Sequence, residues 1–260
     1  MSLSGTQLEE LLDIARRAAG QAADKLASAQ ATAVEFKTAD SRDVKLSADR
    51  ESEKFLKTLF AEETEYPVLG EEYGMDGSER KDGIRWIIDP LDGTANYQRD
   101  LPIYGVSIGL WQNETPLLGV IRDIPRKETF SAISTGPKKG AWIDESGPIR
   151  VGGITEKKQA FIATGFPIYS DFSPKAIARF AEEISQYKKV RLLGSAAIML
   201  AYVACGRVDV YRERDIAVWD IAAGLAIVVG AGGEIELKPS EKVNCYSVFA
   251  SNGKLTPDQI

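Results

Sequence analysis

The sequence contains no histidine among its 260 residues and only two cysteines, Cys205 and Cys245. The absence of histidine excludes Ser-His-Asp and Cys-His catalysis, histidine metal sites and phosphohistidine chemistry. Two cysteines are too few for a disulfide framework or a zinc site, so we expect a reducing, cytoplasmic environment. Any bound metal ion must therefore have oxygen ligands, which favours Mg²⁺, Mn²⁺ or Ca²⁺.

Long apolar runs and an excess of positive charge are also absent. No apolar run reaches the roughly 18 residues of a membrane span, and the first residues lack the basic-then-apolar pattern of a signal peptide. The formal net charge is -6, which argues against an electrostatic surface for nucleic acid or membranes. The composition therefore predicts no nucleic-acid or membrane partner.

What is present is a long chain with ordinary globular composition, 44% of it hydrophobic. Residues 5–28 and 49–62 show helical spacing of apolar residues, and several short strands follow up to about residue 150. From residue 151 to 260, strands and helices alternate, which is typical of an α/β unit. We therefore predict an N-terminal α+β subdomain (1–150) and a C-terminal α/β subdomain (151–260).

The most informative stretch follows the apolar run 84–88, which predicts a buried strand. This strand delivers two carboxylates, Asp89 and Asp92, and is followed by Gly93 and Thr94 in a turn that leads into a short helix. Two acids at the end of a buried strand are costly unless a cation neutralises them. The amides at the helix start could hold a phosphate. Together they indicate metal-assisted phosphoryl chemistry.

The run Asp89, Pro90, Leu91, Asp92, Gly93, Thr94 resembles the D-P-[IL]-D-G-[ST] signature of the inositol monophosphatase family. The resemblance extends to residues 70–72 (Gly-Glu-Glu) and to residues 219–224, which begin with Trp-Asp. Members of this family are magnesium-dependent, lithium-sensitive sugar phosphatases. The resemblance implies a five-layer αβαβα sandwich, a mixture of α+β and α/β, and a homodimer.

The resemblance also implies a set of metal ligands. Asp89 is expected to bridge two ions, and Glu71 is a weaker candidate than its neighbour Glu72. We expect two or three Mg²⁺ ions per subunit, with Mn²⁺ as a possible substitute and Ca²⁺ and Li⁺ as inhibitors. The implied ligands are Glu72, Asp89, the Leu91 carbonyl, Asp92 and Asp220.

For catalysis, the resemblance implies attack by a metal-activated water without a covalent intermediate. Thr94, polarised by Asp49, would orient or deprotonate this water, with Glu72 counted among the catalytic groups. The amides of Gly93 and Thr94 would hold the phosphate, and Lys37 matches a lysine in the family's lid. From the residues alone, a helix cap is the favoured interpretation of Asp49, and the family resemblance reverses this preference.

The substrate contacts implied by the family point to a polyol or sugar monophosphate, with inositol 1-phosphate as the first candidate. Fructose 1,6-bisphosphate, 3′-phosphoadenosine 5′-phosphate and histidinol phosphate remain alternatives. Ser195 could instead only cap a helix, and Glu213 could only pair with a neighbouring arginine. The implied contacts are Asp92, Arg191, Ser195, Ala196, Glu213 and Asp220.

Other interpretations of the acidic motif fit less well. The haloacid dehalogenase phosphatases have a D-x-D-G-T motif, whereas this chain has one more residue between its aspartates. The alternating acids and distal glutamate of an EF-hand are missing. A regulatory or binding protein on the same fold stays open, because some family members are linked to contact with transcription machinery.

Overall fold

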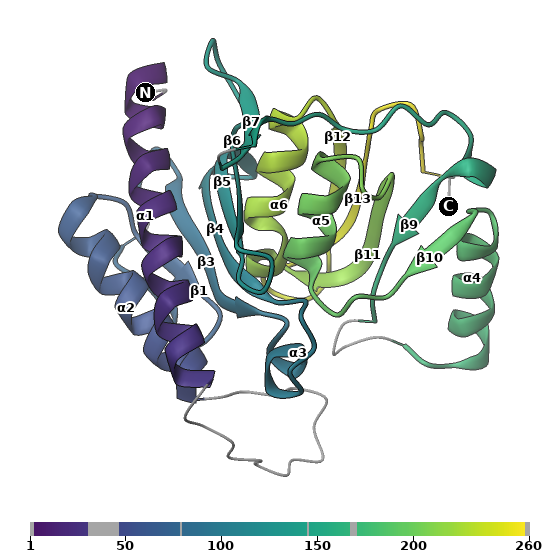
Figure 1. Ribbon diagram of the computed structural model, residues 1–260, viewed down its shortest axis with the longest axis horizontal. Helices are drawn as coiled ribbons and strands as arrows, with labels where there is room; N and C mark the ends of the chain where they lie inside the picture. Colours follow the sequence, from purple (N-terminus) through teal and green to yellow (C-terminus); the bar gives the residue numbers. More distant parts are fainter. Residues whose placement is uncertain (1–2, 31–46, 79, 145, 167–170, 258–260) are drawn as a thin grey trace.

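The computed structural model describes residues 3–30, 47–78, 80–144, 146–166 and 171–257. Its layers alternate between helix and sheet (Figure 1), which confirms the αβαβα sandwich. The first layer contains α1 and α2, the middle layer α5 and α6, and the last layer α4. The helices are α1 (Gly5–Gln30), α2 (Ser47–Glu63), α3 (Thr94–Gln98), α4 (Pro174–Ser185), α5 (Ala196–Ala204) and α6 (Val218–Gly230), with a 3-10 turn η1 (Lys157–Gln159).

The first sheet has, among the described residues, eight strands in the order β2-β1-β3-β4-β5-β6-β7-β8. From β3 to β8 each strand pairs antiparallel with the next, whereas β1 and β3 are parallel. Residues 74–76 form the short edge strand β2, which pairs antiparallel with β1. The strands are β1 (Val68–Gly70), β2 (Gly74–Asp76), β3 (Ile84–Asp92), β4 (Gly105–Gln112), β5 (Thr115–Asp123), β6 (Glu128–Ile133), β7 (Gly140–Ile143) and β8 (Gly147–Pro148).

The second sheet is mixed, with the order β10-β9-β11-β13-β12. β9 pairs in parallel with β10 and β11, and β13 runs antiparallel to both β11 and β12. One apolar core includes residues of both sheets together with α5 and α6. The division into subdomains at residue 150 therefore stays a prediction. The strands are β9 (Phe161–Ala163), β10 (Lys189–Arg191), β11 (Val210–Ala217), β12 (Glu234–Pro239) and β13 (Cys245–Ser251).

Helix α6 lies unusually close to the first sheet. At Gly109 in β4, a Cβ atom would lie 2.9 Å from the Ala222 carbonyl carbon, and at Gly119 in β5 it would lie 2.3 Å from the Ala223 carbonyl oxygen. The two glycines thus let the helix backbone rest directly on the strands. Although α6 is apolar on all sides, no helix in the described part of the chain is long and apolar enough to span a membrane.

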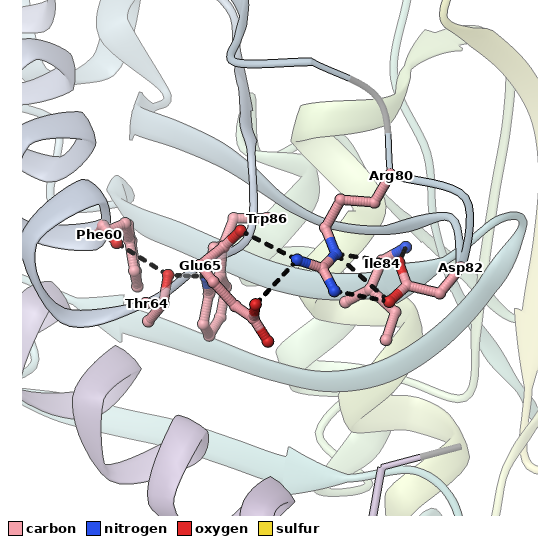
Figure 2. Close-up of polar contacts among 7 residues, drawn as sticks. All are labelled: Phe60, Thr64, Glu65, Arg80, Asp82, Ile84 and Trp86. Carbon is pink, nitrogen blue, oxygen red and sulfur yellow. Dashed lines mark hydrogen bonds and ion pairs between the residues drawn. The ribbon is translucent and has the colours of Figure 1, made fainter. Parts of the chain in front are cut away.

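The start of β3 is fixed by a polar network with the end of α2, which Figure 2 shows. The Trp86 indole donates to Thr64 Oγ1 (3.1 Å), and its ring stacks on Phe60 with centroids 4.4 Å apart. Beside it, the Arg80 guanidinium binds Asp82 (2.9 Å) and Glu65 (3.0 Å). Since β3 carries Asp89 and Asp92, these contacts set the register of the strand that ends at the candidate site.

We predict that Gly119→Ala destabilises the protein by about 1–3 kcal/mol, because the added methyl pushes α6 off β5. Thermal or urea unfolding of the variant measures this change. Gly20→Ala is the matched control, since its Cβ meets nothing within 4 Å and it lies inside α1. The control should raise stability by up to about 1 kcal/mol. Equal stability of Gly119→Ala and the native protein would contradict the proposed close contact.

Candidate metal and substrate site

Three acids from distant parts of the chain meet at one end of the first sheet. Glu71 directly follows β1, Asp89 lies in β3, and Asp220 lies in the first turn of α6. One carboxylate oxygen from each of them lies within 4.8 Å of the other two. The structure therefore brings together two of the predicted metal ligands, Asp89 and Asp220, with Glu71 as their companion.

The prediction that Glu72 is the metal ligand is not supported by this geometry. Its carboxylate faces α2, where Arg50 Nε lies 3.3 Å from Oε2 and the Glu72 side chain is almost completely covered. The physical reason is the turn after Gly70, which points the first glutamate at Asp89 and the second at the helix. Two adjacent glutamates in a sequence do not reveal which of them a turn will direct inward.

The electrostatics of the cluster favour a bound cation. Burial raises the pKa of Asp89 well above its usual value, and the charges of Glu71, Asp92 and Asp220 raise it further. The pKa of Asp220 is also raised, first by burial and then by Asp92, Glu71 and Glu213. Oxygen donors that repel one another are stabilised by a divalent cation, so the donor set fits Mg²⁺ or Mn²⁺.

Asp92 stands beside this group of three and is bound from the second half of the chain. Its Oδ2 accepts hydrogen bonds from Ser195 Oγ (2.6 Å) and from the Ala197 amide (2.7 Å). Burial raises its pKa to about 6, while the hydrogen bonds from Ser195 and the first amides of α5 oppose the shift. The carboxylate therefore lies at the start of α5, next to the predicted substrate residues Ser195 and Ala196.

The short loop after β3 brings the predicted catalytic threonine to the same place. Thr94 Oγ1 donates to the Leu91 carbonyl (3.0 Å), and the Leu91 amide donates to Asp89 Oδ1 (2.9 Å). Gly93 has φ 92°, and a Cβ there would lie 2.8 Å from the Ile103 carbonyl oxygen. Only glycine fits this turn without strain.

Asp49, in the first turn of α2, is buried near the short helix that begins at Thr94. Burial and Tyr104 raise the pKa of Tyr97, in that helix, to about 12, and the charge of Asp49 contributes to the increase. The hydrogen bond from Thr94 to Asp49 stays a prediction. Lys37, the predicted lid residue, lies outside the described residues.

Glu213 and Arg191, the remaining predicted substrate contacts, have different surroundings. Glu213 in β11 is buried, its Oε2 accepts the Tyr211 hydroxyl (2.7 Å), and burial raises its pKa to about 7 with a smaller contribution from Asp92. The Arg191 guanidinium lies over the Phe161 ring at 4.9 Å and donates to the Val190 carbonyl (2.9 Å). Glu213 thus faces the acids, while the contact of Arg191 with substrate stays a prediction.

Asn96 is a site-forming residue that the sequence did not single out beyond its place in a turn. Its Nδ2 donates to the carbonyl oxygens of Ile103 (2.8 Å) and Leu193 (2.7 Å). It therefore ties α3 to the loop that delivers Ser195 to Asp92. No sequence pattern reveals a partner that lies 97 residues away.

Comparison with known proteins gives a consistent result. Residues 7–254 match the inositol monophosphatase family. The Xylella fastidiosa protein named Nus factor SuhB is 42% identical over 200 residues, which span 74% of this chain and 67% of that protein. The Bacillus subtilis inositol-1-monophosphatase is 30% identical over 254 residues, or 95% of this chain and 94% of that enzyme. An inositol monophosphatase structure from Anabaena (Nostoc) has a TM-score of 0.79 at 34% identity, covering 95% and 92% of the two chains.

We predict that Glu213→Gln stabilises the metal-free protein at pH 8 by roughly 1–3 kcal/mol, since it removes a buried charge. The pKa of Glu213 is raised to about 7 in the folded state, so the folded state binds more protons than the unfolded state between pH 4 and 7. The contribution of Glu213 to the free energy of unfolding therefore falls as the pH rises from 4 to 7. Thermal unfolding in EDTA at pH 5 and pH 8 measures the difference.

At pH 5 the gain from Glu213→Gln should largely disappear, because the native side chain is then protonated in the fold. Glu234→Gln, an exposed change at the start of β12, is the control and should shift neither midpoint. An equal effect of Glu213→Gln at both pH values would show that burial of a charge is not its cause.

Proposed function

The chain belongs to the inositol monophosphatase family, and from this membership we propose that it is a Mg²⁺-dependent phosphomonoesterase acting on a small polyol or sugar monophosphate. Inositol 1-phosphate is the first candidate substrate. The observation that carries the proposal is the convergence of Glu71, Asp89 and Asp220 beside Asp92. Acids that repel one another at such short distances are costly without cations, and Asp89 and Asp92 are buried as well. Phosphoryl transfer is a reaction that uses such cations.

In this proposal Glu71, Asp89, Asp92 and Asp220 hold two Mg²⁺ ions, with the Leu91 carbonyl as a further ligand. That carbonyl accepts from Thr94 Oγ1 and has a second lone pair to offer. The ions supply a Lewis acid that lowers the pKa of water and neutralises charge on the phosphoryl oxygens.

The protein's own groups then orient the reactants. We assign the positioning of the attacking water to Thr94, with Asp49 polarising it, and the binding of phosphate oxygens to the Gly93 and Thr94 amides. No protein nucleophile is required, so no covalent intermediate forms. We assign to Glu71 the roles of metal ligand and catalytic group that the sequence interpretation gave to Glu72.

The substrate side favours hydroxyl groups on the leaving group. A carboxylate such as Glu213 accepts hydrogen bonds from vicinal hydroxyls. Arg212 and Arg214, whose charge could have suggested a second phosphate, both pair with Glu183 of α4. This internal pairing supports a monophosphate over a bisphosphate.

Release of inorganic phosphate with Mg²⁺ tests the proposal. Inositol 1-phosphate, fructose 1,6-bisphosphate, 3′-phosphoadenosine 5′-phosphate and histidinol phosphate are compared, each with and without Li⁺. We expect inositol 1-phosphate to be preferred and Li⁺ to suppress its hydrolysis. Preference for one of the others would keep the metal site and reject the assignment of Glu213 to a polyol.

A second candidate function is a binding or regulatory protein that keeps this fold. It is favoured by the name of one relative, the Nus factor SuhB of Xylella fastidiosa, at 42% identity. The complete acid set supports the enzyme instead, because a binding role gains nothing from mutually repelling carboxylates. Metal binding without phosphate release from any substrate would favour the second candidate.

The family also motivates proposals about the protein's setting. We propose that the chain forms a homodimer, which sedimentation or light scattering of the purified protein tests. Cys205 and Cys245 are free thiols, which suits a reducing compartment such as the cytoplasm.

We predict that Glu71→Gln and Glu72→Gln have different effects on activity. Glu71→Gln should lower kcat/KM by more than about 100-fold, since altering groups around a metal ligand already costs about 10–100-fold. Glu72→Gln should change it by less than about fivefold, because Glu72 pairs with Arg50 and is not one of the three acids that converge. Steady-state kinetics at saturating Mg²⁺ measures both. A larger loss for Glu72→Gln would restore Glu72 as the ligand.

A further inference from the structure

Glu53 is a charged residue buried inside the protein, and it binds the turn that follows β1. It lies in α2 and its side chain has no exposed surface. Oε2 accepts the Glu72 amide (2.7 Å) and Oε1 accepts the Tyr73 amide (3.0 Å). Both carboxylate oxygens are thus used to hold the backbone immediately after Glu71.

Lys57, one helical turn further along α2, also binds this turn, at its Gly74 end. Its Nζ lies 3.2 Å from Glu53 Oε1 and donates to the Gly74 carbonyl (2.9 Å). The lysine therefore neutralises Glu53 and clamps the end of the turn at the same time. A buried ion pair is by itself weak evidence for added stability. What the contacts show is that both of its partners bind the backbone of the same turn.

Gly70 shows how closely the carboxylate passes the backbone. A Cβ at this position would lie 2.2 Å from Glu53 Oε1. The glycine before the two glutamates is therefore required by Glu53 rather than by an unusual backbone angle. The Glu53 side chain therefore packs directly against the backbone of Gly70.

We propose that Glu53 is a positioning residue for the metal site, which aims Glu71 at Asp89 and Asp220 through the Glu72 and Tyr73 amides. This inference rests on the proposed metal-binding function of the Glu71, Asp89 and Asp220 cluster. Without Glu53 the turn loses the acceptor for two amides, and Glu71 samples other directions. The site then binds Mg²⁺ more weakly, but the ligands and catalytic groups are all still present.

The test compares Glu53→Gln, Gly70→Ala and the control Glu62→Gln with the native protein. Glu62 is an exposed glutamate of the same helix. Glu53→Gln keeps the shape of the side chain but offers only one acceptor oxygen. Gly70→Ala keeps Glu53 intact and displaces it by contact. Binding of Mg²⁺ and of Mn²⁺ is measured by calorimetry, and phosphate release is followed as Mg²⁺ is raised to saturation.

We expect both test variants to bind the ions about 10–100-fold more weakly, as is usual when support of a metal ligand is lost. At saturating Mg²⁺ their kcat should return to within about threefold of the native value, while Glu62→Gln behaves as the native protein throughout. This separation of metal affinity from kcat is the signature of a positioning role. Loss of a catalytic group would lower kcat at every Mg²⁺ concentration.

A fall in thermal stability with unchanged metal affinity would overturn the proposal, because Glu53 would then be only structural. If Glu53→Gln does not fold, the affinity of Gly70→Ala decides. If instead the proposed metal-binding function is wrong, the native protein itself would bind neither Mg²⁺ nor Mn²⁺.

Discussion

Mutual repulsion among buried carboxylates is the constraint on which this structure depends. Asp89, Asp92 and Asp220 each raise the free energy of the others when ionised, and Glu71 adds to the effect. Such a group does not assemble by itself, so surrounding contacts must hold each acid in place. The hydrophobic burial of two sheets and three helix layers supplies the free energy that overcomes this repulsion.

Three of the acids are held by different devices, which belong to the first sheet and to the helix layer of α5 and α6. Asp89 is fixed by the Leu91 amide at the end of a strand, and Asp92 by the amides and the serine at the start of α5. Asp220 is placed by the close approach of α6 to Gly109 and Gly119. The site is therefore precise because several rigid elements end at the same point, and not because a single loop carries it.

How much of this could be predicted from sequence depends on how local the signal is. The acids of residues 89–92 and 220 stand in contiguous motifs next to clear strand and helix patterns, and the structure brings Asp89 and Asp220 together. The five layers also followed from the family resemblance. The choice between Glu71 and Glu72 has no such local signal, because it depends on the direction of a turn whose amides bind Glu53 in helix α2. The contact of Asn96 with Leu193 is equally non-local, and short periodic patterns contain no information on such a partner.

The hydrogen bonds between Asp92 and α5 fix this carboxylate through groups of the protein itself. The first amides of α5 and the Ser195 hydroxyl are fixed hydrogen-bond donors, and they stabilise part of the negative charge of Asp92. A bound cation then spends less of its binding free energy on ordering the polypeptide, so its affinity for the site is higher. Because the same helix start carries the residues expected to meet the sugar, the polar groups for ion and substrate share one rigid foundation, and neither ligand has to build the site for the other.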